Sequence, residues 1–214
     1  MFKKFLATFV VMIGLFVLVG CSDAGETLGE GVDLEEEAIP DDFEVRTFDE
    51  NPIVAIEIEG HGTIEIELEP DYAPITVTNF VNLVEEGFYD GLTFHRIIEG
   101  FMIQAGDPNG NGSGGSVQTI TGEFANNGIE NSLRHTRGVI SMARQGHDNN
   151  SASSQFFIMH QNAPSLDDDY AAFGTVISGI EVVDSVTASV TPTDNNGTIL
   201  SEDQPIIASI RVVN

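Results

Sequence analysis

The sequence predicts a mostly β domain, in which an antiparallel sheet closes into a barrel. Residues 52–60 (PIVAIEIEG) and 62–70 (GTIEIELEP) alternate apolar and acidic side chains, which is the period-two pattern of half-buried strands. Several more short apolar runs follow along the chain, and few stretches have the spacing of a helix. Many short strands with few helices are typical of closed antiparallel barrels.

The elements are expected in a simple order along the chain. His61–Gly62 separates the two alternating segments and predicts a hairpin turn. Residues 73–87 predict a helix, because Pro74 suits its first turn and Gly87 its end. Further strands are expected at Thr93–Ile98, Met102–Ala105, Gly138–Ala143, Gln155–Met159, Ala172–Ile177 and Ile206–Val213, with a second helix at Ile180–Val186.

The N-terminal segment 1–21 has the pattern of a secretory signal peptide. Lys3 and Lys4 precede an apolar run of about 15 residues, which is shorter than the roughly 20 residues of a membrane-spanning helix. Its end, LVGC, resembles a bacterial lipobox, so Cys21 is expected to carry a lipid that binds the membrane. An uncleaved membrane anchor is the alternative. Cys21 is the only cysteine, which excludes an intramolecular disulfide.

The chain after Cys21 is strongly acidic. It holds all 34 acidic residues and six Arg without any Lys, so its formal net charge is −28. Such a charge disfavours nucleic acid as a partner and suggests an extracytoplasmic or salty setting. Residues 22–50 carry 12 of the acids and predict a disordered tether, of which Phe43–Phe48 can dock on the domain at 51–214.

Other chemistries find little support in the sequence. GNGSGG at 110–115 matches a nucleotide-binding pattern, but the residues after it do not predict a helix. DPNGNG at 107–112 begins like a calcium loop, yet Gln118 stands where the loop needs a Glu. The histidines lack the spacing of metal ligands, and no G-x-S-x-G elbow supports a hydrolase. We therefore expect neither a metal nor a cofactor.

Three blocks of the chain resemble the cyclophilin family of peptidyl-prolyl cis–trans isomerases. They are FHRIIEGFMIQAGDP (94–108), GVISMARQGHDNNSASSQFFIMH (138–160) and LDDDYAAFGTVISG (166–179), in the family's order. The resemblance covers residues 52–214 and is closer to bacterial members. It implies an eight-stranded antiparallel barrel capped by two α-helices, with the active site in a groove on its outer face.

The resemblance also implies which residues act on the substrate. Rotation of an X–Pro bond leaves a lone pair on the proline nitrogen, and a donor aimed at it favours the twisted state. Arg96 is the expected donor, with Gln104 bonded to it and to the substrate backbone. The expected proline pocket and peptide contacts comprise Phe101, Met102, Phe157 and Leu166, the backbone at Ala143 and Arg144, and Gln155 nearby.

Two positions depart from the family's common pattern. Tyr170 stands where a groove histidine is frequent, and a tyrosine can still bond and stack there. Ser165 stands where many members have tryptophan, which puts tight cyclosporin binding in doubt. We therefore expect Arg96 to be fully exposed, on the outer wall of the barrel. Phe94, Ile97 and Ile103 should fill the interior, as should Phe156, and His95 should be a packed, hydrogen-bonded structural residue and not a catalyst.

The function expected from these residues is prolyl isomerisation in secreted or envelope proteins. The protein would act as a monomer anchored outside the cytoplasm through Cys21, on proline-containing polypeptides that are folding. The alternatives are a proline-binding or chaperone module with incidental catalysis, and a surface lipoprotein that uses the domain as an adhesion scaffold.

Overall fold

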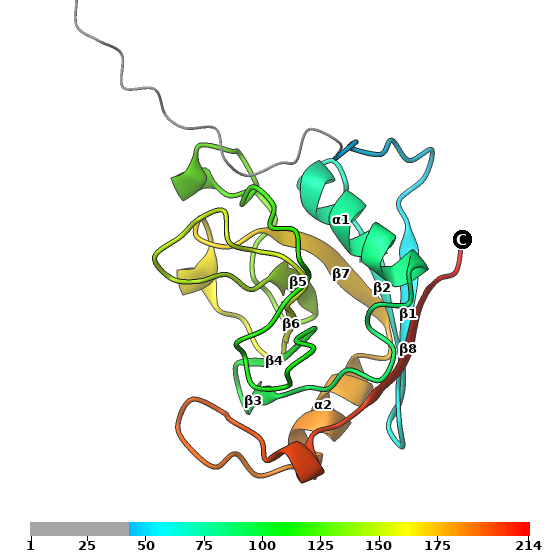
Figure 1. The fold of residues 1–214 in the computed structure, drawn as a ribbon, viewed down its shortest axis with the longest axis vertical. Coiled ribbons are helices and arrows are strands. Elements are labelled where there is room, and N and C mark those ends of the chain that lie inside the picture. Colours follow the sequence, from blue (N-terminus) through cyan, green and yellow to red (C-terminus); the bar gives the residue numbers. More distant parts are fainter. Residues whose placement is uncertain (1–42) are drawn as a thin grey trace, which may run out of the picture. The chain divides into compact units, whose positions relative to one another are not determined.

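The computed structural model describes residues 43–214 (Figure 1). The signal peptide, Cys21 and most of the expected tether lie outside the described residues. No helix within residues 43–214 combines the length and apolar character needed to cross a bilayer.

One antiparallel sheet, with strands of different lengths, forms the framework of the domain. Its order is β3-β4-β6-β5-β7-β2-β1-β8, and every neighbouring pair is antiparallel. The strands are β1 (Ile53–Ile58), β2 (Gly62–Leu68), β3 (Arg96–Ile98), β4 (Met102–Ala105), β5 (Val139–Met142), β6 (Phe156–Met159), β7 (Ala172–Ser178) and β8 (Ile207–Val212). The helices are α1 (Pro74–Glu85) and α2 (Ile180–Ser189), with short 3₁₀ turns at Ala125–Asn127, Pro164–Leu166 and Ser201–Asp203.

The prediction of a closed barrel is wrong, because the sheet is an open half-barrel whose edge strands β3 and β8 are not paired with each other. The loop 194–199 instead occupies the outer edge of β3. Ile97 N donates to Gly197 O at 2.8 Å, and Ile199 N donates to His95 O at 3.1 Å. These bonds cover the outer edge of β3. Strand β8 is bonded instead to residues that precede β3, because Ile207 N donates to Leu92 O and Gly91 N donates to Ile207 O, both at 2.8 Å.

The alternating segments form the strands that their pattern predicts. Alternate residues of β1 and β2 face one side and are buried, while Glu57 and Glu65 are exposed; the buried ones are Val54, Ile56, Ile58, Ile64, Ile66 and Leu68. This arrangement makes one face of the sheet a hydrophobic wall. Helix α1 covers the wall at one end, and Figure 1 places α2 at the other end of the curved sheet.

Helix α1 places Phe80 at the centre of an aromatic cluster. The Phe80 ring lies 5.1 Å from Tyr89, 5.4 Å from Phe156 and 5.1 Å from Phe173. The helix begins at Pro74, as expected, and the carboxylate of Glu123 accepts the free N–H groups of its first turn, at 3.0 Å and 2.8 Å. Helix α2 starts where expected and continues three residues beyond its expected end at Val186, to Ser189.

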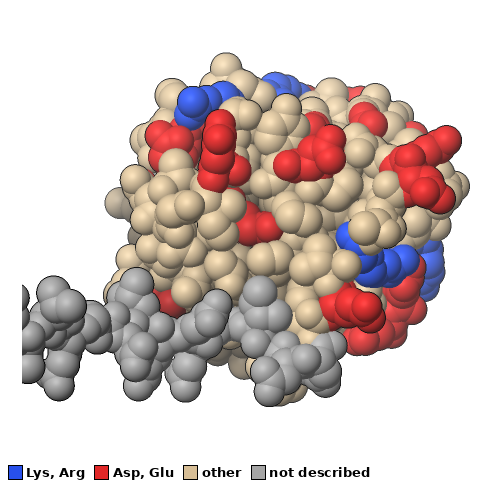
Figure 2. All heavy atoms as spheres, turned by 90° about the horizontal axis from the view of Figure 1, so that it is seen from above, with Lys and Arg blue, Asp and Glu red and all other residues tan. Residues whose placement is uncertain are grey.

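The segment before β1 lies against α1. Arg46 N donates to Thr78 Oγ1 at 3.0 Å, its guanidinium pairs with Glu85 at 2.9 Å, and Phe48 packs against the main core. The end of the expected tether therefore belongs to the folded part of the chain. Figure 2 shows acidic side chains spread over one face of the molecule, with few basic ones.

Candidate active site

The predicted site residues converge on one pocket over strands β3, β4 and β6. All of them except Gln155 line it: Arg96, Phe101, Met102, Gln104, Ala143, Arg144, Phe157, Leu166 and Tyr170. His95, Asn111, Gly112 and Thr198 complete the lining. Strand register explains this convergence, because Arg96 pairs with Gln104, Gln104 pairs with Phe157, and Met102 lies two residues from Gln104 on the same face.

Arg96 is held by two different segments of the chain. Its Nη1 donates to Gln104 Oε1 at 3.0 Å, and its Nε donates to the carbonyl of Asn196 at 2.7 Å. Within residues 43–214, no protein atom accepts a hydrogen bond from Nη2. The guanidinium is therefore fixed in direction, with donor capacity left for a ligand.

Arg96 is half-buried, whereas the sequence suggested full exposure. Burial is the largest influence on its pKa and lowers it from the ordinary value, while the acidic groups of Tyr170 and Asp194 act in the opposite direction. An arginine remains protonated at neutral pH despite such a shift. Partial removal from water strengthens any hydrogen bond that it donates.

The apolar residues of this region fall into two separate groups, as predicted. Phe94, Ile97 and Ile103 belong to the main core inside the sheet, together with Phe156. Met102 and Phe157 belong to a second cluster on the outer side, against which Phe101, Leu166 and Tyr170 pack. Met102 is only 1% exposed, so it forms the floor of the pocket. The second cluster is the apolar part of the candidate site.

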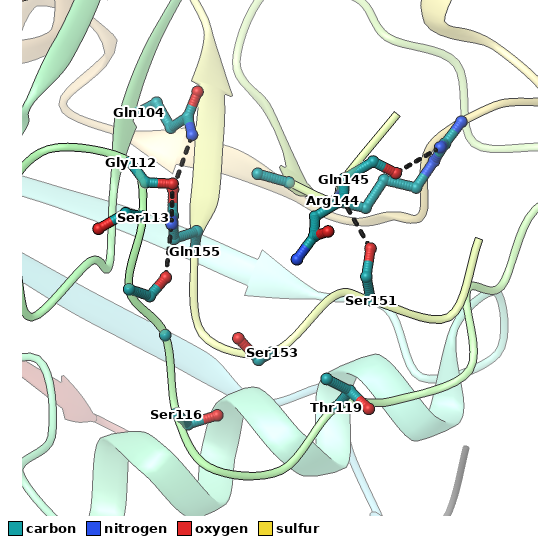
Figure 3. Close-up of a pocket in the computed structure, with 13 residues that line it drawn as sticks. Gln104, Gly112, Ser113, Ser116, Thr119, Arg144, Gln145, Ser151, Ser153 and Gln155 are labelled. Carbon is teal, nitrogen blue, oxygen red and sulfur yellow. Dashed lines mark hydrogen bonds between the residues drawn. The ribbon is translucent and has the colours of Figure 1, made fainter. Parts of the chain in front are cut away.

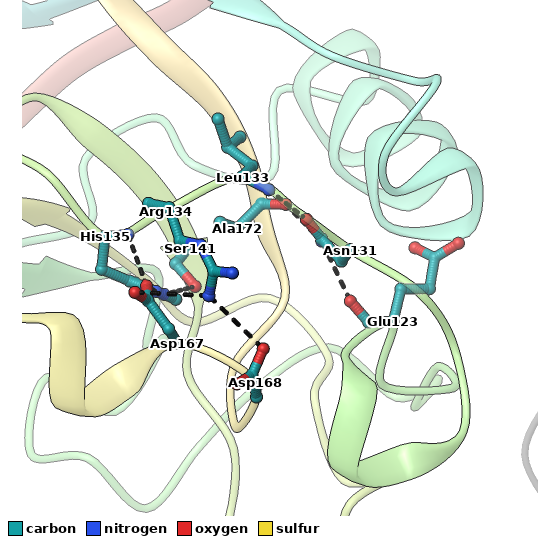
Figure 4. Close-up of polar contacts among 9 residues, drawn as sticks. All are labelled: Glu123, Asn131, Leu133, Arg134, His135, Ser141, Asp167, Asp168 and Ala172. Carbon is teal, nitrogen blue, oxygen red and sulfur yellow. Dashed lines mark hydrogen bonds and ion pairs between the residues drawn. The ribbon is translucent and has the colours of Figure 1, made fainter.

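A buried Ser–His–Asp chain lies behind this apolar wall (Figure 4). His135 Nδ1 lies 3.0 Å from Asp167 Oδ1, and its Nε2 lies 3.0 Å from Ser141 Oγ. Ser141 is fully buried, so no substrate reaches its hydroxyl. The His135 ring stacks on Phe157, a residue of the pocket wall, with 6.0 Å between centroids.

Burial shifts the pKa values of His135 and Asp167. Desolvation lowers the pKa of His135, and the neighbouring Asp167 opposes that effect. Hydrogen bonds from His135, together with the charge of Arg134, keep the pKa of Asp167 low even though burial alone would raise it. Neutral His135 beside an ionised Asp167 is the favoured arrangement near pH 7.

Arg144 lines both this pocket and a second, polar one. Its guanidinium lies 4.8 Å from the ring centroid of Tyr170 and 5.1 Å from that of Phe124. Gln155 lies in the polar pocket, where its Nε2 donates to Gly114 O at 2.7 Å (Figure 3). The remaining polar pocket residues include Ser113, Ser116, Thr119, Gln145, Ser151 and Ser153.

Sequence reasoning missed three contributors to the site. Asn196 contributes a backbone carbonyl from a loop far away in the sequence. A backbone carbonyl is present in every residue, so the residue type gives no indication of this contact. His135 and Asp167 carry recognisable residue types, but only the fold brings them together. His95 is packed as expected, with 4% exposure, but the prediction that its ring is hydrogen-bonded is wrong, because both ring nitrogens lack a partner among the described residues.

Within residues 43–214 no group of three or more His, Cys, Asp or Glu side chains is arranged to hold a metal ion. The pocket offers the guanidinium groups of Arg96 and Arg144, the amide group of Gln104 and an apolar surface. Those features suit a peptide that is bound by backbone hydrogen bonds and by one apolar side chain.

Known proteins resemble this chain in both sequence and fold. A family model described as cyclophilin type peptidyl-prolyl cis-trans isomerase/CLD matches residues 53–212. Peptidyl-prolyl cis-trans isomerase B of Bacillus subtilis is 43% identical over 145 residues, which are 68% of this chain and 92% of that protein. Peptidyl-prolyl cis-trans isomerase-like 2 of Aspergillus oryzae is 47% identical over 117 residues, 54% of this chain but only 20% of that longer protein.

A solved structure agrees with these relatives. The cyclophilin type peptidyl-prolyl cis-trans isomerase of Cryptosporidium parvum, crystallised in the presence of the dipeptide Ala-Pro, is 31% identical with a TM-score of 0.66. The match covers 76% of this chain and 99% of that one. Eight antiparallel strands and two helices are thus the cyclophilin fold. The chain belongs to the cyclophilin family of peptidyl-prolyl cis–trans isomerases.

Proposed function

We propose that this isomerase lowers the barrier to X–Pro rotation by donating a hydrogen bond from Arg96 to the proline nitrogen of the twisted substrate. The observation that supports the proposal most directly is the position of Arg96. Two hydrogen bonds fix its guanidinium at the rim of an apolar pocket, and Nη2 is free of protein acceptors among the described residues. The planar amide offers no lone pair on nitrogen, so this bond strengthens only as the amide twists.

The remaining pocket residues would position the substrate. The proline ring is an apolar group of the size that Phe101, Met102, Phe157 and Leu166 can enclose. Gln104 uses Oε1 for Arg96 and Nε2 for Gln155, which keeps the arginine in place before the substrate arrives. No reorganisation is then needed during rotation, and that is the source of electrostatic preorganisation.

The decisive experiment compares arginine variants in an isomerisation assay. Arg96→Ala should lower kcat/KM for an X–Pro peptide by about 100-fold, the typical size for loss of one preorganised donor. Arg211→Ala removes the same charge from β8, where Arg211 pairs with Asp90, and should leave kcat/KM unchanged. Exchange NMR measures both the rotation rate and peptide binding.

Two results would contradict this mechanism. If Arg96→Ala isomerises peptides as fast as the wild type, Arg96 is not the donor. If neither protein exceeds the uncatalysed rate while both bind the peptide, the protein is a proline-binding or chaperone module.

We further propose that the isomerase acts on secreted or envelope proteins while anchored through a lipid on Cys21, as a monomer. The support is the sequence pattern of residues 1–21 and the acidity of the chain after it. Cys21→Ala should release the protein from membranes or leave its precursor unprocessed. Fractionation with detection of the precursor tests this, and normal anchoring of the variant would overturn it.

A further inference from the structure

Phe101 enters the apolar pocket from the turn between β3 and β4, and this turn is held from outside the two strands. Gly100 adopts φ +76 within it. Gly100 N donates to His160 Nδ1 at 2.8 Å, and Phe101 O accepts from His160 N at 2.9 Å. His160, the residue after β6, therefore contacts the turn through both its ring and its backbone.

These bonds define the protonation of the His160 ring. A backbone N–H can only donate, so Nδ1 must be an unprotonated acceptor and the proton of the neutral ring lies on Nε2. Nε2 lies 3.1 Å from Asp184 Oδ1, a carboxylate that suits this proton. The ring is 12% exposed, so packing also restricts its orientation.

Asp184 is itself fixed by an arginine. Arg137 Nη2 donates to both carboxylate oxygens at 2.8 Å, and its Nη1 donates to His160 O at 2.6 Å. The pair Arg137–Asp184 thus links helix α2 to the end of β6. A continuous set of contacts runs from α2 through His160 to the turn that carries Phe101.

We propose that His160 is a positioning residue for substrate binding: held as its Nε2–H tautomer by Asp184 and Arg137, it fixes Phe101 in the pocket through Gly100. This inference rests on the proposed role of that pocket in holding proline. It adds a residue that touches neither the proline nor Arg96. Its effect should appear in peptide affinity, because Phe101 packs on the substrate while the donor at Arg96 stays in place.

Two substitutions distinguish the roles of the two ring nitrogens of His160. In His160→Asn, the side-chain oxygen can take the place of Nδ1 and accept from Gly100 N. In His160→Gln, the longer amide reaches the place of Nε2 and leaves Gly100 N without its acceptor. We expect His160→Asn to keep the peptide Kd within about twofold, and His160→Gln to raise it about three- to tenfold, the range for one lost hydrogen bond. The exchange rate in the saturated complex should change less.

The position of Phe101 can be followed directly. A fluorophenylalanine at position 101 should change its ¹⁹F chemical shift in His160→Gln and much less in His160→Asn. Asp184→Ala, at a half-exposed site on α2, should raise the peptide Kd in the same direction by a smaller factor, whereas Glu181→Ala on the same helix should not. Urea denaturation shows which variants are folded. If His160→Gln does not fold, Asp184→Ala still tests the proposal.

Equal effects of His160→Asn and His160→Gln, or no effect of either, would overturn the proposal. So would an unchanged Kd in Asp184→Ala for the part assigned to Asp184. These outcomes differ from a failure of the proposed function, in which the wild type itself would not accelerate X–Pro rotation.

Discussion

Gln104 donates from Nε2 to Gln155 Oε1 at 2.9 Å, so the glutamine that holds Arg96 is held in turn by the polar pocket next to the proline site. Gln155 completes the series through its bonds to the carbonyls of Gly112 and Gly114. Arg96 therefore depends on residues that need not touch the reacting amide.

Replacing Gln155 should accordingly weaken catalysis through Arg96. Gln155→Ala is expected to reduce kcat/KM about three- to tenfold, as one supporting hydrogen bond is lost. Gln161→Ala, at an exposed position, is the matched control and should have no effect. The protease-coupled assay measures both variants. Equal activity of Gln155→Ala and the wild type would show that Gln104 needs no support.

Stability should fall in acid because of buried histidines. Burial lowers the pKa of His135 and of His95 below 6.5, so protons bind more tightly to the unfolded chain. The stability of the fold with both histidines neutral is fully present above pH 6.5. It is lost as the pH falls from 6.5 towards the lower pKa values that these histidines have in the folded state. Asp167, whose folded-state pKa is also lowered, adds a further loss of stability as the pH falls below the ordinary aspartate pKa of 3.8.

Urea denaturation between pH 7 and pH 5 measures this effect. Each proton taken up on unfolding lowers the free energy of unfolding by at most about 1.4 kcal/mol per pH unit. His135→Gln should show a shallower dependence than the wild type over this range. Parallel curves for the two proteins would mean that His135 does not contribute.

The docked segment before β1 should stabilise the domain mainly through Phe48. Phe48→Ala removes a ring packed on the core and should lower the free energy of unfolding by about 1–2 kcal/mol, less than for a fully buried ring. Arg46→Ala should cost less than about 1 kcal/mol, because its ion pair with Glu85 is exposed. Val45→Ala, 42% exposed, is the control. Chemical denaturation tests whether Phe48→Ala lowers the free energy of unfolding more than Arg46→Ala and Val45→Ala do.

Cyclosporin should bind this protein weakly. Ser165 immediately precedes Leu166 of the pocket, and it offers none of the apolar area that a tryptophan would add. Ser165→Trp should tighten cyclosporin binding by about tenfold or more, whereas Ser165→Ala should not. Inhibition of the isomerase by a cyclosporin series gives the comparison, and tight binding by the wild type would contradict the prediction.

The strands and the division of apolar residues were predictable because they depend on local patterns. Alternation at Ile53–Ile58 identifies both the strand and its buried face. The spacing of Met102 and Gln104 places both on one side of a strand, and the family resemblance adds that this side carries the pocket. The start of α1 follows from Pro74, whose fixed φ suits the first turn of a helix.

The remaining features depend on contacts between distant parts of the chain. Closure of the sheet could not be judged from strand patterns, because the competitor for the edge of β3 is the irregular loop 194–199. The carbonyl of Asn196 carries no residue-type signal at all. His135, Ser141 and Asp167 have the residue types of a catalytic triad, and only the fold shows that His135 and Ser141 are buried away from any substrate.

The loop 194–199 has a consequence for how the protein handles unfolded chains. An extended peptide readily adds to an exposed strand edge, and an isomerase meets such peptides continually. Here the edge next to Arg96 already carries the backbone bonds of Gly197 and Ile199. A peptide in the groove therefore finds no free backbone groups at this edge of β3, and it cannot extend the sheet beside the proline pocket.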